Sequence, residues 1–124
     1  MIATITKDFT FSAAHRLILP DVHPCGRVHG HNYVIRAQIT GSIIEPGWVI
    51  DYGELKGFGA WIDENLDHQY LNEHLWRINP TAENLAGYLL DILRNVIGPR
   101  TNITEIGVGV SETPKTWATV RGDL

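Results

Sequence analysis

The sequence predicts an α+β domain in which an antiparallel sheet of four to five strands carries two helices on one face. Two long segments near the N-terminus and two shorter ones near the C-terminus alternate apolar with polar residues, as half-buried strands do. Between them, two segments repeat apolar residues at helical spacing. Strands at both ends with helices between them are typical of this class. The 124 residues are enough for a single domain, 1–124, with its own core.

The first two strands are predicted over residues 2–14 and 29–41, where β-branched and aromatic side chains alternate with polar ones. Residues 16–28 contain two prolines and a glycine and should form a loop. A short apolar run at residues 48–51 is predicted to be a further strand.

Two helices follow. Asp51 is the predicted N-cap of the first, with Glu54 placed for a capping box, and apolar residues recur at helical spacing between 55 and 66. Thr81 caps the second, which Gly98-Pro99 ends.

The segment between the helices, residues 67–80, should be irregular. Beyond the second helix, alternation predicts strands over 103–110 and 116–120, joined by a turn at 113–115. A sheet of this size leaves edges that need covering, which predicts association between subunits.

Composition excludes several classes of protein. A net charge of −4 argues against a nucleic-acid-binding surface. No run of about 18 apolar residues is present, so we expect no membrane span. The first residues lack the features of a secretory signal, and the single cysteine cannot form an intrachain disulfide. We therefore expect a cytoplasmic protein.

The segment from Cys25 to His31 is the most informative part of the chain. His29 and His31 are separated by one glycine at the start of a predicted strand, so both imidazoles should point to the same face. Two aligned imidazoles can bind one zinc-like ion, and His15 at the end of the first strand supplies a third. Three histidines would leave a position open for a substrate oxygen, as catalytic zinc sites do. Three imidazoles also suit other divalent ions.

Two further features have both a structural and a chemical interpretation. Cys25 could be a buried, inert thiol, but its loop also contains Arg27, and a nearby cation favours a reactive thiolate. Asp67 and His68 are adjacent, and a carboxylate that accepts from an imidazole strengthens it as a base. Adjacent side chains need not face each other, and the pair could equally be solvated loop residues.

Glu112 follows the strand predicted over 103–110 and precedes a turn. It could be an exposed acid at a strand end. A carboxylate can also accept two parallel N–H bonds from a flat ring edge such as that of a guanine or pterin.

With these residues identified, the chain resembles the 6-pyruvoyl-tetrahydropterin synthase family, and most closely its 6-carboxytetrahydropterin synthase branch of queuosine biosynthesis. The three-residue gap between Cys25 and His29 resembles that branch, since animal pyruvoyl synthases typically have a longer gap. The motifs that carry the resemblance are Phe11-x-Ala-Ala-His15, Cys25-x-x-x-His29-Gly-His31, Asp51-Tyr-x-Glu-Leu-Lys56, Leu66-Asp67-His68-x-Tyr-Leu-Asn72, Asn79-Pro-Thr-x-Glu83 and Glu112-Thr113.

The resemblance implies a tunnelling fold (T-fold), in which subunits join their sheets into an oligomeric barrel, usually a homohexamer built as a dimer of trimers, with active sites between subunits. It implies that dihydroneopterin triphosphate is converted to 6-carboxytetrahydropterin, acetaldehyde and triphosphate. The implied roles are Zn²⁺ binding by His15, His29 and His31, proton abstraction by Cys25, acid/base chemistry by Asp67 and His68, and pterin binding by Glu112. Arg27, Lys115 and Arg121 are candidates for triphosphate contacts, and nothing in the sequence selects among them.

Three alternatives remain open at this point. A pyruvoyl-type synthase would eliminate triphosphate without breaking the carbon chain. An activity like that of dihydroneopterin aldolase would cleave a related pterin. A non-catalytic zinc- or pterin-binding relative would need neither the thiol of Cys25 nor the pair Asp67 and His68.

Overall fold

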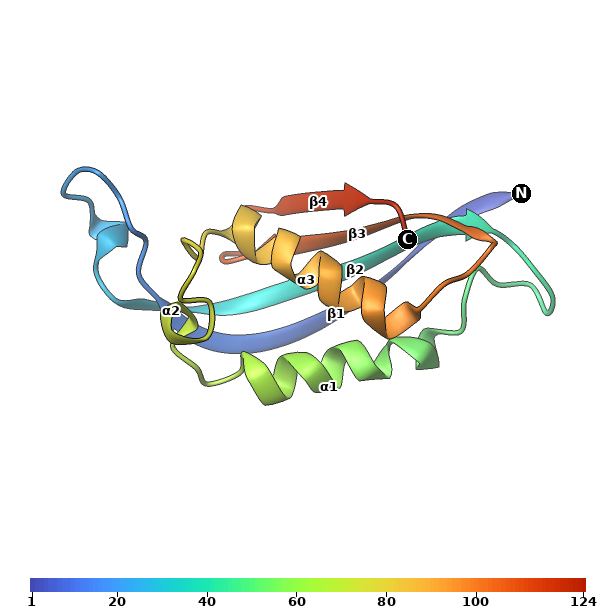
Figure 1. Cartoon of the computed structure of the whole chain (residues 1–124), viewed down its shortest axis with the longest axis horizontal. Coiled ribbons are helices and arrows are strands. Elements are labelled where there is room, and N and C mark those ends of the chain that lie inside the picture. The colour runs from blue at the N-terminus through green and yellow to red at the C-terminus, as the bar shows by residue number, and fades with distance from the viewer.

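A computed structural model describes all 124 residues. It shows one antiparallel sheet whose strands follow each other in chain order, with the helices on one face (Figure 1). The α+β class and the antiparallel sheet are therefore confirmed, with four strands. The strands are β1 (Ile2–His15), β2 (His29–Ser42), β3 (Ile103–Ser111) and β4 (Ala118–Gly122). The helices are α1 (Lys56–Asn65), α2 (Leu71–His74) and α3 (Ala82–Ile97), with 3-10 helices η1 (Pro24–Gly26) and η2 (Tyr52–Leu55).

β1 and β2 form a long ribbon that is paired along its full length, up to His15 opposite His29. β3 pairs with β2 only as far as Val34 opposite Ser111. The first residues of β2 therefore extend beyond β3, and Glu112, which follows Ser111, comes to lie beside them. This stagger builds the site described below.

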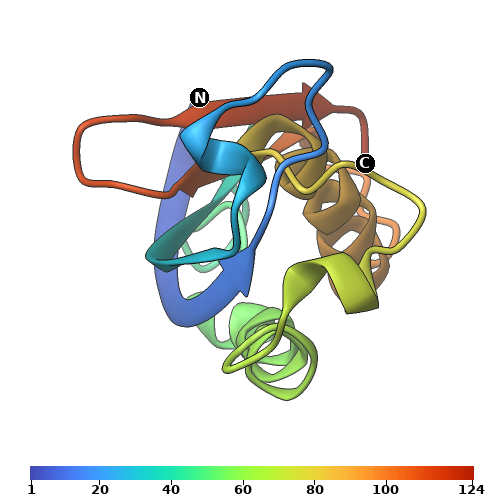
Figure 2. The same cartoon turned by 90° about the vertical axis from the view of Figure 1, so that its left-hand side faces the viewer.

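The core lies between the sheet and helices α1 and α3, which pack on the same side of the curved sheet (Figure 2). Alternation places Tyr33, Ile35, Ala37 and Ile39 on one face of β2, and these residues are at most 1% exposed, so this face of the strand is confirmed as part of the core. At the histidine end of this face, Phe11 and Tyr33 stack with ring centroids 4.7 Å apart. These closely packed aromatic rings thus lie in the core next to the histidine end of the sheet.

Residues 48–51 do not form the predicted strand. Trp48 makes only an isolated bridge with Ile44. Val49 and Ile50 are each 2% exposed, so the apolar run reflects burial against the core and not pairing in the sheet. A short buried run does not by itself distinguish these two cases.

The capping box predicted before α1 is also incorrect in part. Asp51 does act as a cap, but it accepts from the Gly53 N–H (2.9 Å) at the start of η2, one 3-10 turn before α1. Glu54 forms an ion pair with Arg100 instead of reaching back to Asp51. Arg100 lies 46 residues away in the sequence, so a local capping motif cannot predict this ion pair.

Two boundaries differ from the prediction. The segment 67–80, expected to be irregular, contains the one-turn helix α2. β4 begins at Ala118, later than Thr116, because Thr116 belongs to the turn, where its N–H donates to the Thr113 carbonyl (3.2 Å). Strand ends of this kind are decided by turn hydrogen bonds, which alternation does not report.

No helix is both long enough and apolar enough to span a membrane. β1 and β4 are the two edges of the sheet. Near its histidine end, β1 is covered by residues 68–70, through Ala14 N–H to Gln69 O (3.0 Å) and a bridge between Ala14 and Tyr70. The rest of that edge is unpaired, which leaves it available to a further strand.

Two glycines provide a matched test of the fold. A Cβ on Gly41 would lie 2.3 Å from the backbone oxygen of Asn102, whereas a Cβ on Gly87 in α3 would meet nothing within 4 Å. We expect Gly41→Ala to lower the free energy of unfolding by about 1–3 kcal/mol, because backbone cannot move aside cheaply. Gly87→Ala should raise it by about 1 kcal/mol through helix propensity. Denaturant unfolding of both variants measures the difference, and equal stabilities would contradict the packing of β2 against Asn102.

Candidate active site

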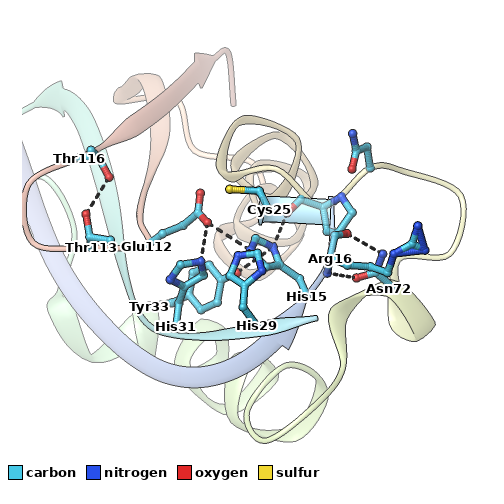
Figure 3. A network of polar contacts seen from close by, with 12 residues as sticks. His15, Arg16, Cys25, His29, His31, Tyr33, Asn72, Glu112, Thr113 and Thr116 are labelled. Carbon is cyan, nitrogen blue, oxygen red and sulfur yellow. Dashed lines mark hydrogen bonds and ion pairs between the residues drawn. The ribbon is translucent and has the colours of Figure 1, made fainter. Parts of the chain in front are cut away.

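Three histidines from β1 and β2 converge at one end of the sheet (Figure 3). His15 lies directly opposite His29 in the ladder, and His31 shares the face of His29 because it is two residues further along the strand. The Nε2 atoms of His15 and His29 are 3.0 Å apart. The centroids of the three rings lie 4.5–5.0 Å from one another. The structure therefore brings together the three histidines singled out in the sequence.

Backbone carbonyls fix how two of these rings present their nitrogens. The Nδ1 of His15 lies 2.8 Å from the Pro80 carbonyl, and the Nδ1 of His29 lies 2.7 Å from the Arg27 carbonyl. A carbonyl only accepts, so each Nδ1 carries its hydrogen and each neutral ring offers a lone pair at Nε2. Two lone pairs 3.0 Å apart repel, and the arrangement needs a positive charge between them, either a proton or a metal cation.

His31 distinguishes a proton from a metal. Its Nε2 atom is buried, has no assigned hydrogen bond and lies 3.0 Å from the Oε2 of Glu112. Burial lowers the pKa of His31, although the charge of Glu112 acts in the opposite direction, so the ring favours its neutral, ligating form. A proton between His15 and His29 would not reach His31, whereas one metal ion would bind the Nε2 atoms of all three rings. The residues therefore fit a metal site.

Glu112 completes the group. Its Oε2 lies 3.0 Å from the Nε2 of His31 and 3.3 Å from the Nε2 of His15. One ligand atom from each of the four residues lies within 4.8 Å of the others. The contact with the His15 imidazole lowers the pKa of the Glu112 carboxyl despite its partial burial, so the group remains a carboxylate. The structure thus places the carboxylate expected to meet the substrate ring directly beside the histidines.

Residues 16–28 form the predicted loop, which carries Cys25 in the short helix η1. Two side-chain amides fix the start of this loop by pairing with backbone as a strand would. Asn72 accepts from Arg16 N–H and donates to Arg16 O, both at 2.9 Å, and Asn79 pairs with Ile18 in the same way. Cys25 is half-buried, and Figure 3 shows its thiol pointing toward the side of the cluster where Glu112 lies.

Asp67 and His68 do face each other. The Oδ2 of Asp67 lies 2.9 Å from the Nδ1 of His68. Ser12 holds both residues, because its N–H donates to Asp67 Oδ1 (3.0 Å) and its carbonyl accepts from His68 N–H (2.7 Å). These hydrogen bonds, first from Ser12 and then from His68, lower the pKa of Asp67.

His68 also adopts a φ of +60°, which costs a residue other than glycine about 1–2 kcal/mol. Backbone strain of this kind is concentrated at functional sites. The hydrogen bonds with Ser12 and this backbone conformation therefore hold Asp67 and His68 in one arrangement at the edge of β1.

The structure does not join this pair to the histidine cluster by any hydrogen bond or ion pair. His31 and His68 both line one open pocket of about 540 Å³. The His68 side chain is 83% exposed, and it therefore remains available to groups outside its own subunit. The side chain of Arg27 is likewise exposed, and only its carbonyl contributes to the site.

Some supporting groups were not singled out by sequence reasoning. The Pro80 carbonyl and the Tyr33 hydroxyl both lie near the Nδ1 of His15, at 2.8 Å and 3.2 Å. Burial raises the pKa of Tyr33, so its hydroxyl stays protonated. Tyr33 could have been found, because it continues the face of His29 and His31. Pro80 lies in the motif Asn79-Pro-Thr-x-Glu83, but its residue type gives no sign of this contact, since it acts through its backbone carbonyl.

Comparison with known proteins gives a consistent result. Residues 4–123 match the family described as 6-pyruvoyl tetrahydropterin synthase. A protein of Synechocystis named 6-carboxy-5,6,7,8-tetrahydropterin synthase is 34% identical over 110 residues, which cover 82% of this chain and 83% of the relative. The 6-pyruvoyl tetrahydrobiopterin synthase of Drosophila melanogaster is 32% identical over 137 residues, 98% of this chain and 80% of the relative.

The solved structure of the 6-pyruvoyl tetrahydropterin synthase of Caenorhabditis elegans superposes with a TM-score of 0.83, at 28% identity, over 99% of this chain and 97% of the other. The expected tunnelling fold is thereby confirmed. The chain therefore belongs to the 6-pyruvoyl tetrahydropterin synthase family.

Proposed function

We propose that this protein is a zinc-dependent 6-carboxytetrahydropterin synthase, which converts dihydroneopterin triphosphate to 6-carboxytetrahydropterin, acetaldehyde and triphosphate in queuosine and related deazapurine biosynthesis. The observation that carries the proposal is the convergence of three imidazole nitrogens next to the loop that bears the only cysteine. The name of the Synechocystis relative and the short gap between Cys25 and His29 favour the carboxy product.

His15, His29 and His31 would hold the zinc. When bound, zinc would act as a Lewis acid that polarises the oxygens of the substrate side chain and makes them more acidic. The carbonyls of Pro80 and Arg27 would fix the orientation of two of these ligands, as outer partners of metal-binding histidines commonly do.

The remaining residues would move protons and orient the substrate. Cys25 would remove a proton from the substrate side chain, and the imidazole of His68 would return one, with Asp67 setting its tautomer. Glu112 would accept N–H bonds from the pterin ring and so fix its orientation. Arg27 is proposed to contact the triphosphate.

Pyruvoyl-type elimination is the second candidate, favoured by the similarity to the Drosophila protein over nearly the whole chain. Products separate the two activities. Zinc-loaded protein would be incubated with dihydroneopterin triphosphate and the products identified by mass. Release of acetaldehyde with 6-carboxytetrahydropterin supports the proposal, while triphosphate release with the carbon chain intact supports the second candidate.

We also propose a homohexamer, arranged as a dimer of trimers, with active sites between subunits. Three observations support this assembly. Part of the β1 edge is unpaired, no hydrogen bond or ion pair joins Asp67 and His68 to the histidine cluster, and His68 is exposed.

Mixing two inactive variants tests the shared site. Cys25→Ala and His68→Ala should each be inactive alone. After they are unfolded and refolded together in equal amounts, about a quarter of the wild-type activity per site should return, because one site in four receives an intact residue from both subunits. Mixing after separate refolding is the control. No recovery would mean that both residues act within one subunit.

A further inference from the structure

We infer that Glu112 is a fourth protein ligand of the metal in the substrate-free enzyme, and that the substrate must take this carboxylate from the metal in order to open the site. This inference rests on the proposed function, since it concerns the same zinc and the same substrate. It adds a step to that function, because the Glu112 carboxylate would bind either the metal or the pterin ring but not both at once.

The contacts of Glu112 carry the first half of the inference. The carboxylate comes from the end of β3 and reaches between histidines of two other strands, with Oε2 at 3.0 Å from His31 Nε2 and 3.3 Å from His15 Nε2. A carboxylate oxygen of Glu112 belongs to the group of ligand atoms that lie within 4.8 Å of one another. A carboxylate oxygen is an ordinary zinc ligand. Three imidazoles with one carboxylate would fill the four positions of a zinc ion and partly neutralise its charge.

The chain geometry explains why this carboxylate reaches the cluster. β3 stops pairing with β2 at Ser111 opposite Val34, and the next residue, Glu112, lies alongside the histidine end of β2. The Ser111 hydroxyl donates to the Thr113 carbonyl and so closes the backbone around Glu112. The backbone therefore fixes where the Glu112 side chain begins, so its contact with the histidines does not depend on a flexible surface side chain.

The second half follows from ligand counting. A zinc site with four protein ligands is closed, whereas catalysis needs a position for a substrate oxygen. If Glu112 also accepts N–H bonds from the pterin ring, binding to the ring would make its carboxylate unavailable to a metal held by the histidines. The ring would thus release the metal position that the substrate side chain then occupies. An empty enzyme would keep its metal closed to water and other small ligands.

Metal affinity tests the first half without any turnover. Zinc affinity would be measured by competition with a chromophoric chelator for the wild type, Glu112→Ala and Glu112→Gln. We expect Glu112→Ala to weaken zinc binding by at least about tenfold, with Glu112→Gln intermediate. The control is Glu105→Gln, an exposed acid on the same strand, which should leave the affinity unchanged. With Co²⁺ in place of zinc, the visible spectrum should change in both Glu112 variants and not in the control.

Pterin, the ring without a side chain, tests the exchange in the unaltered protein. It can draw Glu112 away but brings no side-chain oxygen to the metal. We expect pterin to weaken zinc binding to the wild type, and zinc to weaken pterin binding by the same factor, as linkage requires. This coupling should vanish in Glu112→Ala. Because the wild type is used, a folding defect in a variant cannot account for the result.

The outcomes separate the two proposals. A protein that binds no zinc or Co²⁺ contradicts the proposed function itself. Suppose instead that the protein binds zinc and makes 6-carboxytetrahydropterin, but that neither Glu112 substitution nor pterin changes its metal affinity or its Co²⁺ spectrum. That result overturns only this inference.

Discussion

Replacing Cys25 with alanine should reduce kcat by about a hundred- to ten-thousand-fold, the range associated with loss of a general base. The residue lies in a loop that two asparagine side chains attach to the rest of the chain, so its removal should leave the loop in place. Its sulfur is not among the clustered ligand atoms, and zinc content should therefore stay at the wild-type level. Steady-state kinetics together with metal analysis measures both quantities.

Two variants sharpen this result. Cys25→Ser keeps the size of the side chain but offers a hydroxyl far too weakly acidic to serve as the base, so it should be nearly as inactive as Cys25→Ala. Asp21→Asn changes an exposed residue of the same loop and should be fully active. Wild-type turnover by Cys25→Ala, or loss of zinc with the thiol, would contradict the assignment of Cys25 as the base.

Replacing His31 with alanine should remove the stabilisation that zinc gives the folded protein. At a free zinc concentration of 100 times Kd, that stabilisation is about 2.7 kcal/mol. In the metal-free protein the same substitution should change the free energy of unfolding less, because there it removes only the contact between the Nε2 of His31 and the Oε2 of Glu112 (3.0 Å). Denaturant unfolding with and without zinc, and the zinc stoichiometry of each protein, measure the effect.

His68→Ala is the matched control for this prediction, since His68 is an exposed histidine outside the cluster. It should bind zinc as the wild type does and lose only turnover. Retention of one tightly bound zinc by His31→Ala would show that the three imidazoles do not form the metal site.

Local patterns were sufficient to predict most of the fold. Alternation over β2 predicted which of its side chains face the core, since a strand has a period of two and the row from Tyr33 to Ile39 is buried throughout. The same period placed His29 and His31 on one face. The capping residue Thr81 and the stop at Gly98 bounded α3 because caps are local hydrogen bonds.

The patterns were wrong where a distant partner decided the structure. The run Val49-Ile50 is buried without being a strand, and Glu54 pairs with Arg100 instead of capping its own helix. In both cases the competing contact lies far away in the sequence. Hydrophobic period and capping motifs do not contain that information.

The sequence alone determined the chemistry available to this protein, namely three imidazoles, one thiol and an aspartate next to a histidine. Only the tertiary structure decided how these groups are arranged. Strand pairing sets His15 opposite His29 and brings Glu112, at the end of β3, next to the histidines. Hydrogen bonds with Ser12 in β1 position Asp67 and His68. Residue types are fixed by the chain, whereas distances between side chains from different strands are fixed by hydrogen bonds that form only in the folded sheet.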